Sequence, residues 1–382
     1  MVEQLNVGIA GARRGPALIA GFRAHENVEV TAICDIDEER LRQAADRHAI
    51  RNRFTDFDRM LESDIDLVFV ATPMHLHVPQ TLTALNAGKH VMSEVTAAVS
   101  VEQCRELFDG VQRAKKSGLK YMMAENVCFE WDSLIIRNMV RKGLFGELYF
   151  GEGEYLHEIR ALHYDDGGTP TWRSRWQVGV NGCTYGTHSL GPVLEWFDDR
   201  VDWVVCLGSG RHTAPEHEAE DTTTMLCKTT SGALIKIRVD MLSNRPHGGI
   251  YLALQGTKGC YEASRGFRGR PKVWLDDFEE TSAGGNGHDG SGREWRPLAD
   301  FEDEFLPDFW KNAPPEAFAS AHGGTDFFVV NDIIAAIRED KEPEIDVYRA
   351  LDYTLPGLMS QISIAQHGRP VKVPDFRAGE WT

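Results

Sequence analysis

The stretch LNVGIAGARRG, residues 5–15, decides the fold of this chain, because it joins an apolar run to a glycine-bearing turn. The apolar run predicts a buried β-strand. Glycines after such a strand let the backbone turn tightly and let a pyrophosphate approach the start of the next helix. Gly11 and Gly15 suit this role, but Arg13 stands where the middle glycine of a G-x-G-x-x-G fingerprint is expected. A plain strand-to-helix turn therefore remains an alternative.

Asp35 ends the next predicted strand, about 20 residues beyond the turn, where dinucleotide-binding proteins place an acidic residue. A carboxylate there hydrogen-bonds the adenosine ribose hydroxyls and repels a 2′-phosphate. We therefore expect NAD rather than NADP, although the basic Arg13 and Arg14 keep NADP open. A helix N-cap is the alternative role of Asp35.

Outward from this turn, the first 125 residues alternate short apolar runs with amphipathic segments, which predicts a parallel, doubly wound sheet of the Rossmann type. Two segments, 71–77 (ATPMHLH) and 88–94 (GKHVMSE), end strands at the carboxyl edge, where ligands of open α/β sheets bind. The predicted strands are 5–10, 28–34, 67–71, 90–92 and 120–123, and the predicted helices are 18–24, 38–48, 57–61, 77–86 and 101–115.

From about Phe129 the pattern changes to longer strand-like runs with few helices between them, which predicts an α+β domain with a mixed or antiparallel sheet. We therefore expect an NAD-binding domain over residues 1–125 and a second domain over residues 126–382. The glycine-rich stretch 279–293 is expected to form a mobile loop. The predicted strands are 148–156, 201–208, 222–227, 233–241, 250–255 and 272–275, and the predicted helices are 132–142, 325–339 and 348–367.

The composition excludes several classes of function. Asp and Glu number 58 against 41 Lys and Arg, a formal net charge of −17, which disfavours nucleic acid and anionic membrane as partners. No apolar run approaches the ~18 residues that cross a bilayer, and the N-terminus lacks the features of a signal peptide. Seven scattered cysteines without a C-x-x-C pair argue against a disulfide framework or a structural zinc site. We expect a cytoplasmic protein.

These segments resemble the Gfo/Idh/MocA oxidoreductase family over nearly the whole chain. The resemblance implies a Rossmann domain followed by an α+β domain with a large open-faced, mostly antiparallel sheet, and it makes residues 126–382 a substrate-binding and oligomerisation domain. It also implies an NAD(P) cofactor, a sugar substrate and a homodimer or homotetramer. It is carried by VGIAGARRG (7–15), ATPMHLH (71–77), GKHVMSE (88–94), GLFGEL (143–148), DVYRAL (346–351) and PVKVPDF (370–376).

Two departures from that family indicate a branch within it. Glu94-Val95-Thr96 replaces the Glu-Lys-Pro of typical dehydrogenases of the family, and Thr184 replaces an aspartate four residues before the expected catalytic histidine. Three segments resemble instead the NAD-dependent glycosidases of glycoside hydrolase family 109, which also carry Glu-Val. They are MMAENV (122–127), GEGEYLH (151–157) and TYGTHSLGP (184–192).

That branch implies hydrolysis without net redox change, in contrast to the paired carboxylates of ordinary glycosidases. Hydride leaves C3 of the sugar for NAD, the resulting ketone acidifies the C2 proton, and loss of that proton expels the C1 substituent. Water adds to the enone and the hydride returns, so we expect NAD to be tightly bound and recycled. A net NAD-dependent sugar or polyol dehydrogenase is the alternative, and a non-enzymatic sugar or NADH sensor is a further one.

The expected catalytic residues follow from this chemistry and the family match. His188 is expected to take the C3 hydroxyl proton, and Tyr155, as a phenolate, the C2 proton. Tyr185 precedes His188 by three residues and is expected to contact substrate or act as an acid. Glu125 is expected to orient sugar hydroxyls or assist the leaving group. A buried structural histidine, a half-buried strand aromatic and a hinge carboxylate are the alternative roles of His188, Tyr155 and Glu125.

Further residues are expected to bind the two ligands. Tryptophan faces suit sugar rings and arginines suit an anionic group, so the substrate is expected to be a sugar or glycoside, possibly anionic, with a solvated loop as the alternative. No metal is expected, since Glu154 and His157 face opposite sides of a strand. The expected cofactor-binding residues are Gly11, Ala12, Arg13, Arg14, Asp35, Thr72, Pro73, His75, His77, Glu94 and Asn126, and the expected substrate-binding residues are Arg160, Trp172, Arg173, Arg175, Trp176 and Thr187.

Overall fold

The computed structural model describes residues 4–165, 167–246, 249–265, 269–278, 294–319 and 322–381, so the stretch 279–293, predicted as a loop, lies outside the described residues. The chain forms two compact units. Unit 1 comprises Met1–Phe129, Ala313–Leu358 and Pro374–Thr382, and unit 2 comprises Glu130–Asn312 and Met359–Val373. Two C-terminal segments thus return to unit 1, whereas the sequence-based division placed them with the second domain.

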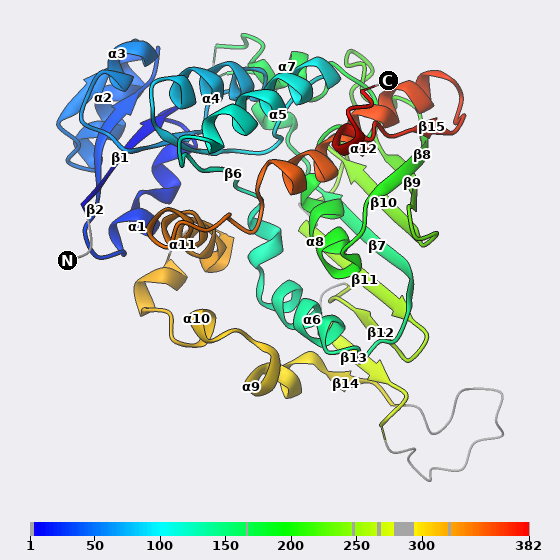
Figure 1. The fold of residues 1–382 in the computed structure, drawn as a ribbon. Helices are drawn as coiled ribbons and strands as arrows, with labels where there is room; N and C mark the ends of the chain where they lie inside the picture. The colour runs from blue at the N-terminus through cyan, green and yellow to red at the C-terminus, as the bar shows by residue number, and fades with distance from the viewer. Residues whose placement is uncertain are drawn as a thin grey trace, which may run out of the picture. The chain divides into compact units, whose positions relative to one another are not determined.

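Unit 1 is built on a six-stranded parallel sheet in the order β3-β2-β1-β4-β5-β6, which is the strand order of a Rossmann fold (Figure 1). Every residue of β4 is buried, as expected for a parallel strand with helices over both faces. The strands are β1 (Leu5–Ala10), β2 (Val28–Cys34), β3 (Asn52–Phe54), β4 (Leu67–Val70), β5 (His90–Ser93) and β6 (Tyr121–Met123). The helices are α1 (Ile19–Arg23), α2 (Glu38–Arg47), α3 (Phe57–Leu61), α4 (His77–Asn86), α5 (Val101–Lys115) and α11 (Thr325–Arg338).

Two glycines fix the turn after β1. Gly11 has a φ of +102°, and a Cβ there would lie 2.5 Å from the carbonyl oxygen of Ala71, so only glycine fits. A Cβ at Gly15 would lie 2.3 Å from a methyl of Ile9, so the helical turn that begins at Gly15 packs directly on β1. The turn therefore has the tight bend and the close helix packing of a dinucleotide-binding fingerprint, with Arg13 exposed between them.

Unit 2 is built on a nine-stranded sheet in the order β14-β13-β12-β11-β7-β10-β9-β8-β15. Only β7 and β10 pair in parallel among its described strands, so the sheet is mostly antiparallel, as predicted. The strands are β7 (Leu148–Leu156), β8 (Val201–Gly208), β9 (Thr223–Thr229), β10 (Leu234–Asp240), β11 (Gly249–Gly256), β12 (Gly259–Glu262), β13 (Lys272–Leu275), β14 (Arg296–Pro297) and β15 (Val371–Lys372).

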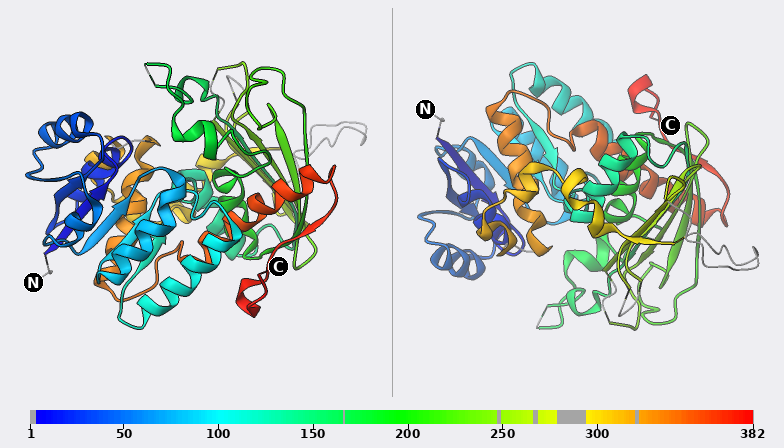
Figure 2. Two further views of the ribbon diagram at one scale, coloured as in Figure 1. Left: turned by 90° about the horizontal axis from the view of Figure 1, so that it is seen from above. Right: turned by 90° about the horizontal axis from the view of Figure 1, so that it is seen from below.

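The helices of unit 2 include α8 (Thr187–Phe197), which lies against one face of the sheet (Figure 2). The last helix, α12, contributes its residues up to 358 to unit 1 and those from 359 to unit 2. None of the helices in the described ranges is long and apolar enough to cross a membrane. The remaining helices are α6 (Trp131–Arg141), α7 (Trp172–Trp176), α8 (Thr187–Phe197), α9 (Glu302–Phe305), α10 (Asp308–Lys311) and α12 (Val347–Ala365).

The approach of α8 to β7 fixes the position of His188. A Cβ at Gly151 would lie 2.6 Å from Val193 of α8, and a Cβ at Gly153 would lie 2.3 Å from the carbonyl oxygen of Ser189. Strand side chains alternate, so Tyr155 points toward the same face as these two glycines. Helix α8, whose second residue is His188, therefore lies directly on the backbone of β7.

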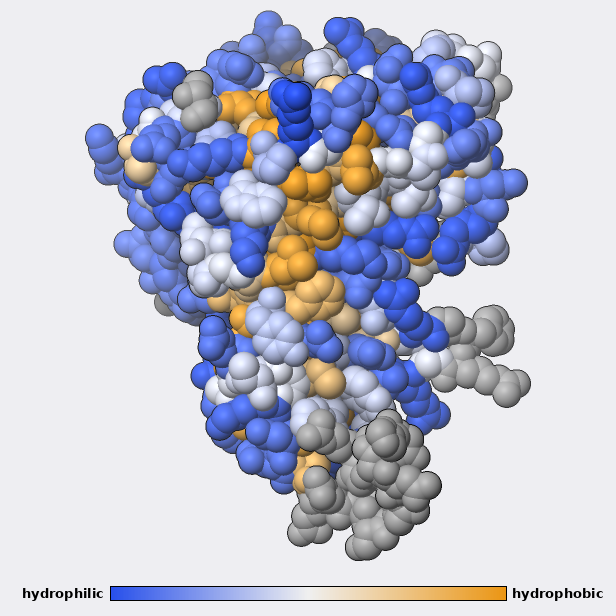
Figure 3. Space-filling view, turned by 90° about the vertical axis from the view of Figure 1, so that its right-hand side faces the viewer, coloured by the Kyte–Doolittle hydropathy of each residue, from blue (hydrophilic) through white to orange (hydrophobic). Residues whose placement is uncertain are grey.

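The opposite face of this sheet carries exposed apolar side chains on three neighbouring strands. Leu207 of β8 is 57% exposed, Leu226 of β9 40% and Leu234 of β10 36%. Beside them, Glu152 is paired with Lys236. Figure 3 shows hydrophobic side chains gathered in a band on the surface that it presents. We call the face of the sheet that carries Leu207, Leu226 and Leu234 the open face.

Gly153→Ala is expected to lower the free energy of unfolding by about 1–3 kcal/mol, because the added methyl overlaps the Ser189 carbonyl. Urea denaturation followed by tryptophan fluorescence measures the change. Gly21→Ala in α1 is the control, since its Cβ would meet nothing closer than 3.5 Å and alanine favours the helix. Wild-type stability in Gly153→Ala would contradict the packing argument.

Candidate functional site

Asp35 lies at the carboxyl end of the β2 segment, beside the glycine turn. Its Oδ2 accepts a hydrogen bond from the Ala12 amide at 2.8 Å, and its Oδ1 accepts one from the Asp37 amide at 2.9 Å. The N-cap of α2 is Asp37, whose carboxylate accepts from the Arg40 amide, so the alternative role of Asp35 as that cap is wrong. Each oxygen of Asp35 keeps a lone pair for a ligand hydroxyl. The glycine turn and this fixed carboxylate fit the pyrophosphate and the adenosine ribose of NAD.

Arg14, within the same turn, is held by two carboxylates of unit 1. Its Nε lies 2.8 Å from Glu94, and its Nη1 lies 3.0 Å from Asp326, which is almost fully buried at the start of α11. Burial alone would lower the pKa of Arg14, but the two carboxylates outweigh it and raise the pKa above its usual value. Because this guanidinium is engaged within the protein, it is poorly available to a 2′-phosphate, which favours NAD.

Asp326 was not anticipated from the sequence. Burial alone would raise its pKa, but hydrogen bonds from His322 and Arg14 and their charges lower the pKa below its usual value. No local pattern connects it with Arg14, because 312 positions separate the two residues. Helix α11 thereby contributes a structural carboxylate to the cofactor end of unit 1.

The loops after β4 and β5 are joined by His77. Its ring is buried, with Nδ1 2.8 Å from the carbonyl oxygen of Thr96 and Nε2 2.9 Å from that of Thr72. Burial lowers the pKa of His77, so the ring is neutral at pH 7 and donates to one carbonyl at a time. His77 therefore positions these loops, while Thr72 itself donates to Gln80. Among the other predicted cofactor residues, Pro73, His75 and Glu94 are half-buried, and Asn126 is buried and donates to Thr325.

Four rings of unit 2 form one cluster at the carboxyl end of β7. The ring of Tyr155 stacks on His157 with centroids 4.7 Å apart and meets His188 edge-on at 5.0 Å. Tyr185 lies 6.3 Å from Tyr155 and 5.5 Å from His188. The structure thus brings together the predicted catalytic residues Tyr155, Tyr185 and His188, with Thr187 buried beside them at the start of α8. We call these four rings the ring cluster.

His157 is a member of the ring cluster that the sequence interpretation did not include. The signal was present, since residues two apart on a strand share a face and Tyr155 was already assigned to the site. Glu125, the fourth predicted catalytic residue, belongs to unit 1, where it is fully buried and accepts a hydrogen bond from the Val127 amide. Its catalytic role stays a prediction.

The predicted substrate-binding arginines are largely engaged by neighbours. Arg160 pairs with Glu158 at 2.7 Å, while Arg173 lies over the ring of Trp172 and Arg175 over that of Trp176. The segment is anchored by the backbone of His163, whose carbonyl accepts from the Thr171 amide and the Ser174 hydroxyl. It therefore forms a short helix, α7, whose two arginines lie over tryptophan rings. The described part of the chain has no group of three or more His, Cys, Asp or Glu residues that could hold a metal ion.

Comparison with known proteins agrees with this geometry. Residues 5–125 match the oxidoreductase family with the NAD-binding Rossmann fold, and residues 129–210 and 199–382 match the C-terminal domain of glycosyl hydrolase 109. A glycosyl hydrolase family 109 protein of Shewanella woodyi is 31% identical over all of this chain and 86% of its own length.

Two solved structures share the fold. An oxidoreductase domain protein from Kribbella flavida has a TM-score of 0.80 at 20% identity, covering 97% of this chain and all of that one. A levoglucosan dehydrogenase in complex with NADH and levoglucosan has a TM-score of 0.78 at 19% identity, covering 98% of this chain and all of that one. The predicted fold class, the predicted family and the predicted NAD cofactor are confirmed.

Asp35→Asn is expected to weaken NADH binding about 10-fold and to reduce the preference for NADH over NADPH, since one charged hydrogen-bond acceptor is lost. Fluorescence titration with NADH and NADPH measures both affinities directly. Asp109→Asn, at an exposed position of α5, is the control and should leave both unchanged. An unchanged ratio of affinities in Asp35→Asn would show that this carboxylate does not select the cofactor.

Proposed function

The chain belongs to the glycosyl hydrolase 109 family, and from that premise we propose that it is an NAD-dependent glycosidase whose cofactor undergoes no net change. The observation that carries the proposal is the ring cluster, in which a tyrosine and a histidine meet edge-on at 5.0 Å. Two proton-transfer groups at one place suit a reaction that moves protons at two neighbouring carbons.

The chemistry begins with oxidation at C3 of a sugar. When bound, NAD⁺ supplies the hydride acceptor at C3 and the hydride donor at the end of the cycle. The imidazole of His188 takes the C3 hydroxyl proton and gives it back to the same oxygen at the end. Gly11 and Asp35 hold the dinucleotide, and the engagement of Arg14 by Glu94 and Asp326 keeps the turn rigid.

The ketone at C3 acidifies the C2–H bond, and the phenolate of Tyr155 removes that proton. The electron pair of the C2–H bond forms a C1–C2 double bond as the C1–O bond breaks, and Tyr185 donates a proton to the departing oxygen. Water then adds its oxygen to C1 and gives one proton to Tyr185, while Tyr155 returns its proton to C2. The balance is one glycoside and one water consumed for one free sugar and one alcohol.

The residue that follows Glu94 favours this route over simple oxidation. Val95 is 4% exposed and has no group that can move a proton. The levoglucosan dehydrogenase with the same fold makes a net NAD-dependent sugar dehydrogenase the second candidate. The two candidates differ in whether a leaving group is released and in whether NADH accumulates.

Incubation of the purified protein with aryl glycosides in D₂O, without added cofactor, distinguishes the two candidates. We expect release of the aryl alcohol, deuterium at C2 of the sugar and no net NADH. NADH accumulation without release of the alcohol would refute the glycosidase and support the dehydrogenase. His188→Ala and Tyr155→Phe should each lower kcat/KM about 10²–10⁴-fold, whereas Tyr149→Phe, at an exposed position of the same strand, should not.

We also propose that the open face of the unit 2 sheet binds a second copy of the chain. It combines exposed Leu207, Leu226 and Leu234 with the Glu152–Lys236 ion pair, a mixture that can complement itself across a twofold axis. Exposed apolar side chains on adjacent strands also need a cover, since an uncovered patch promotes aggregation.

Leu226→Asp is expected to shift the protein toward the monomer in light scattering coupled to gel filtration, because a buried charge in the interface is unfavourable. Ile362→Asp, at an exposed apolar position of α12, is the control and should leave the mass unchanged. A monomeric wild-type protein would rule out this role of the open face.

A further inference from the structure

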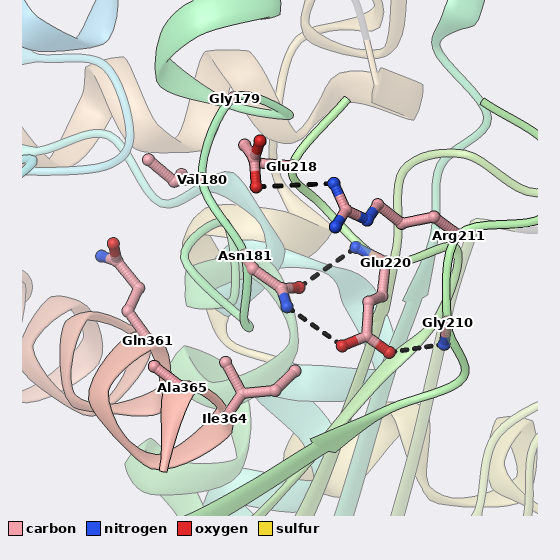
Figure 4. Close-up of a pocket in the computed structure, with 10 residues that line it drawn as sticks. All are labelled: Gly179, Val180, Asn181, Gly210, Arg211, Glu218, Glu220, Gln361, Ile364 and Ala365. Atoms are coloured by element: carbon pink, nitrogen blue, oxygen red, sulfur yellow. Dashed lines mark hydrogen bonds and ion pairs between the residues drawn. The ribbon is translucent and has the colours of Figure 1, made fainter. Parts of the chain in front are cut away.

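A pocket of about 600 Å³ lies in unit 2, outside the ring cluster (Figure 4). Three segments form it: residues 179–181 after α7, residues 210–220 between β8 and β9, and residues 361–365 of α12. Its volume is within the range of small-molecule sites in proteins. Neither the sequence interpretation nor the proposed reaction uses it.

The walls of the pocket are fixed by hydrogen bonds between these segments. The amide of Asn181 donates to Glu220 at 3.1 Å, and its oxygen accepts from the backbone of Glu220 at 3.1 Å. The other carboxylate oxygen of Glu220 accepts from the Gly210 amide. A backbone bond from Ala219 to Val178 adds a further link. The pocket is therefore preorganised, because its polar groups are already held in place.

The side chains that line the pocket suit a neutral ligand rich in hydroxyl groups. Arg211 pairs with Glu218 at 3.5 Å, and Glu220 accepts hydrogen bonds from Asn181 and the Gly210 amide, so each charged group has a partner within the wall. The two carboxylates outnumber the single guanidinium, which disfavours an anion. Hydroxyl groups both donate and accept, and they can bond these fixed carboxylates and amides together.

Two further features favour a carbohydrate. The side chain of Gln361 lines the pocket, and among the described residues no hydrogen bond of its amide is found. Beside it, Ile364 and Val180 supply an apolar surface for the C–H face of a sugar ring. Figure 4 shows Gln361 and Ile364 on α12, with Val180 and Asn181 on the neighbouring segment.

The pocket lies on the same edge of the sheet as the ring cluster. Strands β7 and β8 run in the same direction, and both of their carboxyl ends lie at this edge. With β10 and β9 between them, the two ends are about 14 Å apart at a strand spacing of about 4.8 Å. Asn181 also precedes Tyr185 by only four residues, so one short segment borders both the pocket and the ring cluster.

We propose that this pocket is a second carbohydrate subsite, which holds the leaving-group end of a neutral oligosaccharide whose reacting sugar lies at the ring cluster. The inference rests on the proposed glycosidase for its position along the glycan. It names the substrate class as a glycan longer than a monosaccharide glycoside.

Binding to an array of immobilised neutral oligosaccharides tests the subsite. The NAD-loaded protein carries Tyr155→Phe in every sample, so that glycans are not cleaved during the measurement. We expect the protein with Tyr155→Phe alone, called the background, to bind at least one oligosaccharide. The protein that carries both Tyr155→Phe and Gln361→Trp should bind it at least about 10-fold more weakly, because a hydrogen bond and pocket volume are lost. Gln366→Trp, just beyond α12, is the matched control and should bind like the background. Equal thermal stability of the variants excludes misfolding as the cause.

Hydrolysis of an aryl monosaccharide by Gln361→Trp, with Tyr155 intact, separates the two proposals. An unchanged rate together with weakened array binding is the expected result. Absence of hydrolysis in the wild type, with array binding still sensitive to Gln361→Trp, would refute the glycosidase and leave the carbohydrate pocket standing. The subsite is overturned if no oligosaccharide binds, if Gln361→Trp binds as tightly as the background, or if spermidine displaces the glycan from the pocket.

Discussion

Backbone lying directly against backbone is the constraint on which both units depend. In unit 1, Gly11 lies against the carbonyl of Ala71, and in unit 2, Gly153 lies against the carbonyl of Ser189. Neither contact leaves room for a side chain, so the positions of the nucleotide turn and of α8 follow from the main chain. The side chains of Asp35 and His188 are thereby placed by rigid elements, as a preorganised site requires.

Ion pairs with nearby carboxylates are the second feature common to the two functional regions. The protein carries a formal net charge of −17, and two arginines, one near each functional region, are engaged by local carboxylates. Arg14 is held by Glu94 and Asp326, and Arg160 is held by Glu158. The engagement of Arg14 agrees with a cofactor that lacks a 2′-phosphate. The anionic sugar considered from the sequence is supported mainly by Arg175, which is exposed.

Local patterns predicted most of the regular structure. The predicted limits of β1, β2, α4 and α5 agree with the observed ones. Each of these segments contains the whole apolar run or repeat from which it was predicted. The short strands β3 and β12 were not predicted, because their sequences, NRF and GCYE, hold no apolar run. Three of the four predicted catalytic residues meet in one cluster, and the resemblance to the family, rather than a local pattern, identified them. The partnership of Arg14 with Asp326 and the pocket of three separate segments depend on long-range contacts, which no local pattern encodes.

The division of the chain into interleaved segments has a consequence for its synthesis. The chain passes between the units at residues 129, 312, 358 and 373, so neither unit is a continuous stretch. During translation the Rossmann strands emerge first, but α11, which packs on α1, follows 312 positions after Arg14. Domains of multidomain proteins commonly fold in order as they leave the ribosome. Here Arg14, in the N-terminal segment of the cofactor unit, lacks its buried carboxylate partner until most of the protein has been made.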